Sequence, residues 1–88
     1  MNYLKEIGVE KDLNSMSEGE MLSKIREFNQ INIYTVNEYW CIQLFDLEVS
    51  ANDEVDNVGE FSNTELKQVL IMALEDIAEK VYNRNYDF

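Results

Sequence analysis

The sequence predicts an α+β fold: a small antiparallel sheet of two or three strands, with an N-terminal helix and a long C-terminal helix packed on one face. Two stretches carry the residues that start helices, and the run between them is rich in β-branched and aromatic residues. The chain has no proline and only three glycines, so tight turns are few. At 88 residues, we expect 1–88 to form a single small acidic domain.

The stretch "MSEGEM" predicts the start of the first helix. Ser17 is placed as the N-cap and Glu20 follows three residues later, which is the spacing of a capping box. Met16 and Met21 flank the box in the positions of a hydrophobic staple. This pattern predicts an N-terminal helix over about 17–28.

The stretch "FSNTEL" repeats the pattern before the second helix. Ser62 and Glu65 form the predicted capping box, and Phe61 and Leu66 form the staple. A helix over about 63–83 follows, because apolar residues then recur at helical spacing. Its apolar stripe comprises Leu66, Val69, Leu70, Ala73, Leu74, Ile77 and Val81.

Between the two helices, "INIYTV" and "YWCIQLFDLEV" are separated by Asn-Glu, which predicts a β-hairpin over 31–49. A third short strand near 55–61 would extend the hairpin into a meander. On the second strand, alternate side chains face opposite sides of the sheet, Trp40, Ile42 and Leu44 against Tyr39, Cys41 and Phe45. Only one of these faces can meet the C-terminal helix, so either the first helix or a partner covers the other.

The sequence lacks the residues that several kinds of catalytic and metal site require. The chain has no histidine, which removes Ser/His and Cys/His nucleophile pairs and most zinc or haem sites. The single cysteine, Cys41, lies in an apolar run and is typical of a buried small side chain. We therefore expect no enzyme activity and no cofactor. The N-terminus has no signal-peptide pattern and no apolar run is long enough to span a bilayer, so we expect a soluble, cytoplasmic protein without a membrane partner.

Residues 52–65, "NDEVDNVGEFSNTE", place five carboxylates around a glycine and invite comparison with a calcium loop. With Gly59 at the sixth position of an EF-hand, Val58 occupies the fifth, where an oxygen ligand belongs. The preceding segment is typical of a strand, whereas an EF-hand requires a helix there. We therefore predict no metal site.

The charge is unevenly distributed. The net charge is −11, and no lysine or arginine occurs between Arg26 and Lys67. Phosphate binding relies on lysine and arginine, so direct binding to nucleic acid or an anionic membrane is disfavoured. The acidic stretch instead fits a protein with a basic, nucleic-acid-binding surface, which this chain would inhibit by imitating nucleic acid. The predicted contact residues are Glu38, Asp46, Glu48, Asp53, Glu54, Asp56 and Glu60, with Tyr34 as an aromatic anchor.

A second stripe on the C-terminal helix, Ile71, Ala78 and Tyr82, lies roughly 100° from the first. One interpretation buries it under the N-terminal helix. The other makes it a homodimer surface, as in a structural or regulatory adaptor whose acidity serves only solubility.

In its use of Asn, Ile, Glu and Lys, the chain resembles the small acidic accessory proteins encoded by phages and mobile elements of AT-rich bacteria. The resemblance is one of composition, and it assigns no role to any residue.

Overall fold

The computed structural model describes residues 3–47 and 57–86. The predicted α+β class is confirmed, since a three-stranded antiparallel sheet lies with a short N-terminal helix and a long C-terminal helix. The element order is η1 (Leu4–Ile7), η2 (Leu13–Ser15), α1 (Glu18–Arg26), β1 (Asn29–Val36), β2 (Tyr39–Asp46), β3 (Gly59–Asn63) and α2 (Leu66–Tyr86).

The sheet has the order β1-β2-β3, with both pairs antiparallel. The predicted hairpin forms, and Asn37 takes the left-handed conformation in its two-residue turn, with a φ of 55°. Asparagine tolerates this conformation better than most side chains, which explains why the turn forms without glycine. The third strand also forms, at Gly59–Asn63; part of the range predicted for it falls outside the described residues.

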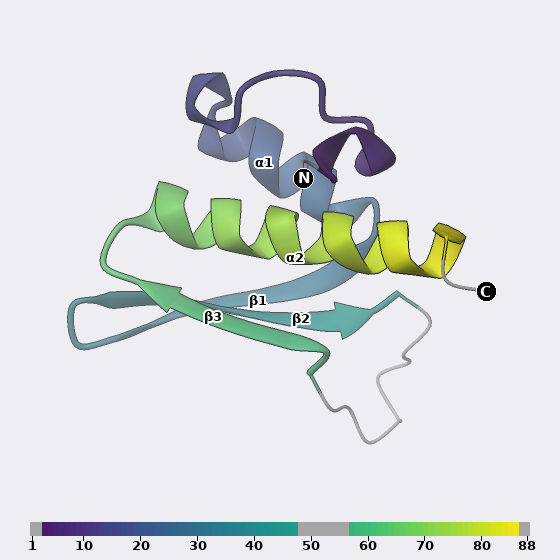
Figure 1. The fold of residues 1–88 in the computed structure, drawn as a ribbon. Coiled ribbons are helices and arrows are strands. Elements are labelled where there is room, and N and C mark those ends of the chain that lie inside the picture. Colours follow the sequence, from purple (N-terminus) through teal and green to yellow (C-terminus); the bar gives the residue numbers. More distant parts are fainter. Residues whose placement is uncertain (1–2, 48–56, 87–88) are drawn as a thin grey trace.

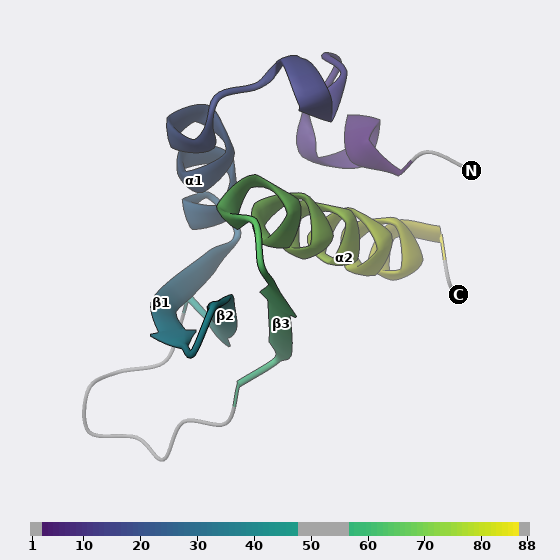
Figure 2. The ribbon, with the colours of Figure 1, turned by 90° about the vertical axis from the view of Figure 1, so that its left-hand side faces the viewer.

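Both helices lie on the same side of the sheet (Figure 1). α2 packs over β2 and β3, and α1 packs against β1 and α2. The N-terminal segment with η1 lies against α2 on the side away from the sheet, as Figures 1 and 2 both show. The molecule therefore has three layers, with α2 in the middle one.

The main core lies between α2 and β2. Ile42 and Leu44 point toward the helices and are 0% and 1% exposed, in agreement with the alternation in the sequence. Complete burial of an aliphatic side chain of this size stabilises a fold by about 1.5–3 kcal/mol. The α2 side chains that are fully buried in this core are Val69, Leu70, Ala73, Leu74 and Ala78.

The predicted start of the first helix is confirmed in detail. The Ser17 hydroxyl accepts a hydrogen bond from the Glu20 N–H at 3.1 Å, and Glu20 Oε1 accepts one from the Ser17 N–H at 3.2 Å. Lys11 Nζ lies 2.9 Å from the other Glu20 oxygen. The hydrogen bond from Lys11, followed by that from the Ser17 backbone, lowers the pKa of Glu20. The stabilisation is therefore present above the ordinary glutamate pKa and is lost as the pH falls through the folded-state value.

The start predicted for the second helix is wrong. Ser62 lies in β3 opposite Cys41, and α2 begins at Leu66. Pairing with β2 keeps the chain extended as far as Asn63, so Ser62 is not free to cap a helix. Asn63 makes the local turn instead, because its Oδ1 accepts a hydrogen bond from the Glu65 N–H at 3.0 Å.

The second stripe on α2 is covered by the chain itself. Ala78 is fully buried, and Ile71 packs against the core. Tyr82 stacks on Tyr3 of the N-terminal segment, with ring centroids 4.4 Å apart. Ala78 is therefore not accessible to a second copy in this fold, whereas Ile71 and Tyr82 are only partly buried. The interpretation of the stripe as a dimer surface stays a prediction.

Replacing Ser17 by alanine should lower the free energy of unfolding by about 0.5–2 kcal/mol, the usual loss for an N-cap side chain. The matched control is Ser62→Ala, which removes an exposed hydroxyl from a strand and should change stability by no more than about 0.5 kcal/mol. Urea denaturation measures both. Equal losses in the two variants would contradict the assignment of Ser62 to β3.

Candidate interaction surface

The sheet has one face turned away from both helices, and no other element in the described ranges packs on it. Of the two alternatives for this face, coverage by the first helix is wrong, because α1 shares the opposite face with α2. Coverage by a partner stays a prediction. We call it the open face. By strand alternation and register, it comprises Gln30, Asn32, Tyr34, Val36, Tyr39, Cys41, Gln43, Phe45, Glu60 and Ser62.

At the centre of the open face, Tyr34 and Glu60 reach across β2 and meet. The Tyr34 hydroxyl donates a hydrogen bond to Glu60 Oε1 at 2.9 Å. This hydrogen bond, with a smaller contribution from desolvation, raises the pKa of Tyr34 above its ordinary value. Cys41 lies directly opposite Tyr34 on β2 and is 7% exposed. The pair links the two outer strands of the sheet.

A second polar contact orders the same face. Asn32 Nδ2 donates a hydrogen bond to Gln43 Oε1 at 3.1 Å between directly opposite positions on β1 and β2. Side chains held in this way lose less conformational freedom when a partner binds. The open face is thus partly organised before any contact.

Beside the Tyr34–Glu60 pair lies a hollow of about 520 Å³. Val36 and Tyr39 at its rim are 50% and 45% exposed. Aliphatic and aromatic walls next to a carboxylate suit a basic side chain, whose stem packs on the walls while its charged end meets the carboxylate and the ring face. The lining residues are Val36, Tyr39, Cys41, Glu60, Phe61 and Ser62.

The predicted acidic residues are spread out. Glu38 lies in the turn between β1 and β2, and Asp46 lies at the far end of β2, roughly 25 Å away at about 3.3 Å per residue. Glu60 lies between them, on the open face. Of the predicted contact residues that the structure describes, only Tyr34 and Glu60 are brought together. Glu48, Asp53, Glu54 and Asp56 lie outside the described residues.

The basic residues occupy the helical side of the molecule. Residues 29–63 contain seven acids and no base. The ion pairs among the described residues all lie in the N-terminal segment or the helices: Lys11–Glu20, Lys24–Glu27 and Lys80–Asp76. Lys80 also donates a hydrogen bond to the Val58 carbonyl, so one helical cation touches the backbone just before β3.

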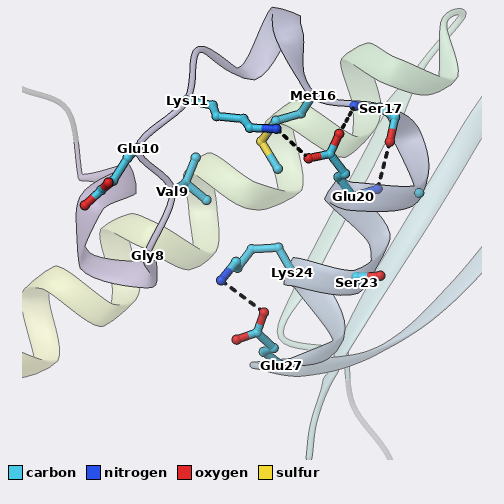
Figure 3. Close-up of a pocket in the computed structure, with 11 residues that line it drawn as sticks. Gly8, Val9, Glu10, Lys11, Met16, Ser17, Glu20, Ser23, Lys24 and Glu27 are labelled. Carbon is cyan, nitrogen blue, oxygen red and sulfur yellow. Dashed lines mark hydrogen bonds and ion pairs between the residues drawn. The ribbon is translucent and has the colours of Figure 1, made fainter.

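A groove of about 580 Å³ lies between residues 8–11 and α1 (Figure 3). Lys11 and Lys24 point into it, but each is paired with a glutamate of α1 or its end, Glu20 at 2.9 Å and Glu27 at 3.0 Å. Neither lysine is left without a counter-charge. Ser17 and Glu20, which also line the groove, are engaged in the capping box that starts α1. We assign the groove no function.

Neither a calcium loop nor a membrane helix is supported. Gly59 lies in a strand paired with β2, and β2 stands where an EF-hand needs a helix. Within residues 3–47 and 57–86, no three acidic or cysteine side chains gather as metal ligands. No helix in the same ranges has the length and apolarity to cross a bilayer.

No family model, curated protein or solved structure matches this chain. Sequence reasoning did not select Val36, Tyr39 or Ser62, which line the hollow. Strand alternation placed Tyr39 on the face away from Ile42, but the hollow depends on the register between β2 and β3, and no local pattern encodes that register.

Glu60→Gln should lower the pKa of Tyr34 toward the ordinary value of 10.0, because it removes the carboxylate that favours the protonated phenol. Tyrosinate absorbance across a pH titration measures this, with Tyr34→Phe identifying the transition. Since the folded-state pKa is raised, the stabilisation is present below the ordinary value and is lost as the pH rises through the folded-state one. The control, Glu38→Gln, carries the same charge change and should leave Tyr34 unaltered. An unchanged Tyr34 transition in Glu60→Gln would remove the basis for this contact.

Proposed function

We propose that this chain is a non-enzymatic, acidic protein-binding module that inhibits a DNA- or RNA-handling protein by occupying its nucleic-acid groove. The observation that supports the proposal is the open face, a sheet surface without basic residues that carries an ordered carboxylate–phenol pair beside an apolar hollow. The partner is a protein with a basic surface, and the chain does not bind nucleic acid directly.

Electrostatics favour this partner in two ways. A groove lined by lysine and arginine attracts an acidic surface, and complementary charge accelerates the encounter. The seven acids of residues 29–63 have no base within their own segment, so they retain charge for a partner. Nucleic acid carries the same sign of charge as this chain and is repelled by it.

The hollow gives the proposed contact an anchor. Binding energy in protein interfaces is concentrated in a few aromatic and charged residues that become desolvated. Tyr39 and Glu60 are such residues, and they border the same hollow. We propose that a basic side chain of the partner enters there and that Glu38 and the other acids of 29–63 contribute mainly to orientation.

In this proposal the protein acts in the cytoplasm, where the machinery of DNA and RNA metabolism is found. An inhibitor of that machinery is also consistent with the compositional resemblance to phage and mobile-element accessory proteins.

A second candidate is a structural or regulatory interaction protein whose acidity serves only solubility. The exposed Val36 and Tyr39 favour it, because they offer an apolar contact to a partner of any charge. Salt separates the two candidates: a charge-driven complex weakens as salt rises, whereas an apolar contact is much less affected.

The test compares two triple charge reversals. Glu38→Lys, Asp46→Lys and Glu60→Lys change the sheet side, while Glu10→Lys, Glu75→Lys and Glu79→Lys make the same charge change at exposed positions on the helical side. Proteins captured from lysate are identified by mass spectrometry at low and high salt. We expect a nucleic-acid-binding protein that is released by salt and displaced by added nucleic acid. The sheet-side variant should lose it and the helical-side variant should keep it.

Equal loss in both variants would show that only total charge matters. A partner that resists salt and is not displaced by nucleic acid would contradict mimicry and favour the second candidate. Circular dichroism must show that both variants are folded before their binding is compared.

A further inference from the structure

The outer edge of β1 is a free strand edge. Residues 31–36 pair with β2 on one side, and no strand of the described chain lies on the other. Half of the backbone N–H and C=O groups of an edge strand point away from its neighbour and are able to pair with a further strand.

β1 lacks the features that usually protect such an edge. Natural sheets block edges with short strands, charged side chains, proline or bulges. β1 is eight residues long, contains no charged residue and no proline, and pairs with β2 without interruption. The opposite edge, β3, has five residues, includes Glu60, and has its preceding carbonyl at Val58 engaged by Lys80. Of the two edges, β1 is the one suited to strand addition.

The apolar side chains of β1 also remain incompletely covered. Ile31 and Ile33 face the helices and pack against the core but are only partly buried, unlike Ile42 and Leu44 on the neighbouring strand. Val36 on the open face is half exposed. A strand added beside β1 would cover all three.

The uncharged β1 suits a second copy of this chain as the added strand. The net charge is −11, so a second copy is repelled by the acidic surfaces and meets the least repulsion at a strand that carries no charge. An antiparallel pair of β1 strands brings no carboxylate of either strand opposite another. Among the described residues, the acids that flank β1 are Glu27 and Glu38. They approach one another at the two ends of the pair, and salt screens their repulsion.

We propose that β1 pairs antiparallel with β1 of a second copy, around a two-fold axis perpendicular to the sheet, to form one six-stranded sheet. This geometry keeps the helices of both copies on one side and joins their open faces on the other. The inference does not depend on the proposed inhibitor function, since it uses a neutral edge instead of the acidic face.

Sedimentation analysis of the full chain, over a range of protein concentrations at low and high salt, tests the proposal. We expect a concentration-dependent twofold rise in mass that is favoured by salt, the reverse of the salt effect expected for a basic partner. Hydrogen exchange should show that amides of residues 31–36 become more protected as the dimer forms.

The edge variant is Asn32→Lys with Thr35→Lys, both at exposed positions of β1. The matched control is Ser62→Lys with Thr64→Lys, also exposed and with the same charge change. Added lysines reduce the repulsion between acidic copies, so charge alone would favour association in both. We expect the edge variant to be monomeric and the control to dimerise.

A wild type that stays monomeric under all these conditions overturns the proposal. A control that loses the dimer along with the edge variant also overturns it, because self-association would then involve the open face or β3. An edge variant that still dimerises excludes β1 as the contact. A monomeric wild type whose capture of another protein requires an intact β1 edge would assign the edge to a foreign strand instead.

Discussion

The packing of α2 against Ile42 and Leu44 is the contact on which the rest of the structure depends. These two side chains are almost completely buried, and they lie on the central strand, so they fix which face of the sheet points inward. α1 then packs beside α2 on the same face. With both helices used on one side, the other face of the sheet is held by contacts among its own side chains, such as Tyr34 with Glu60.

Charged side chains on the helices form ion pairs, whereas the acids of the strand segments have no basic residue near them in the sequence. A helix brings residues three or four apart onto one side, which allows Lys24 to pair with Glu27 and Lys80 with Asp76. The strand segments contain no base, so their acids have no such partner nearby in the sequence. Self-repulsion of this kind lowers stability, and it is offset here by the apolar core on the opposite side of the sheet.

The features that the sequence predicts well are formed by residues that lie close together in the chain. The capping box at Ser17 closes within four residues and is present as expected, and the hairpin follows from two adjacent runs. The same pattern at Ser62 does not form a capping box, because Ser62 pairs with Cys41 in the sheet instead. Cys41 is distant in the sequence, so the local pattern does not reveal this pairing. The Tyr34–Glu60 contact could not be predicted from the sequence either, because it depends on the register of two strands that are not adjacent in the sheet. The sequence predicted that both helices pack on one face of the sheet, and strand alternation placed Tyr39 and Ile42 on opposite faces. Neither observation identified the Ile42 face as the one that the helices cover.

The N-terminal segment shields the side of α2 that faces away from the sheet. It is built from two short 3-10 turns, Leu4–Ile7 and Leu13–Ser15, which have few internal hydrogen bonds. It nevertheless packs against α2 and stacks Tyr3 on Tyr82. Segments of this kind open locally at a lower free energy than core helices. Transient detachment of residues 3–9 would uncover apolar side chains of α2 on an otherwise intact fold, and exposed apolar patches favour aggregation.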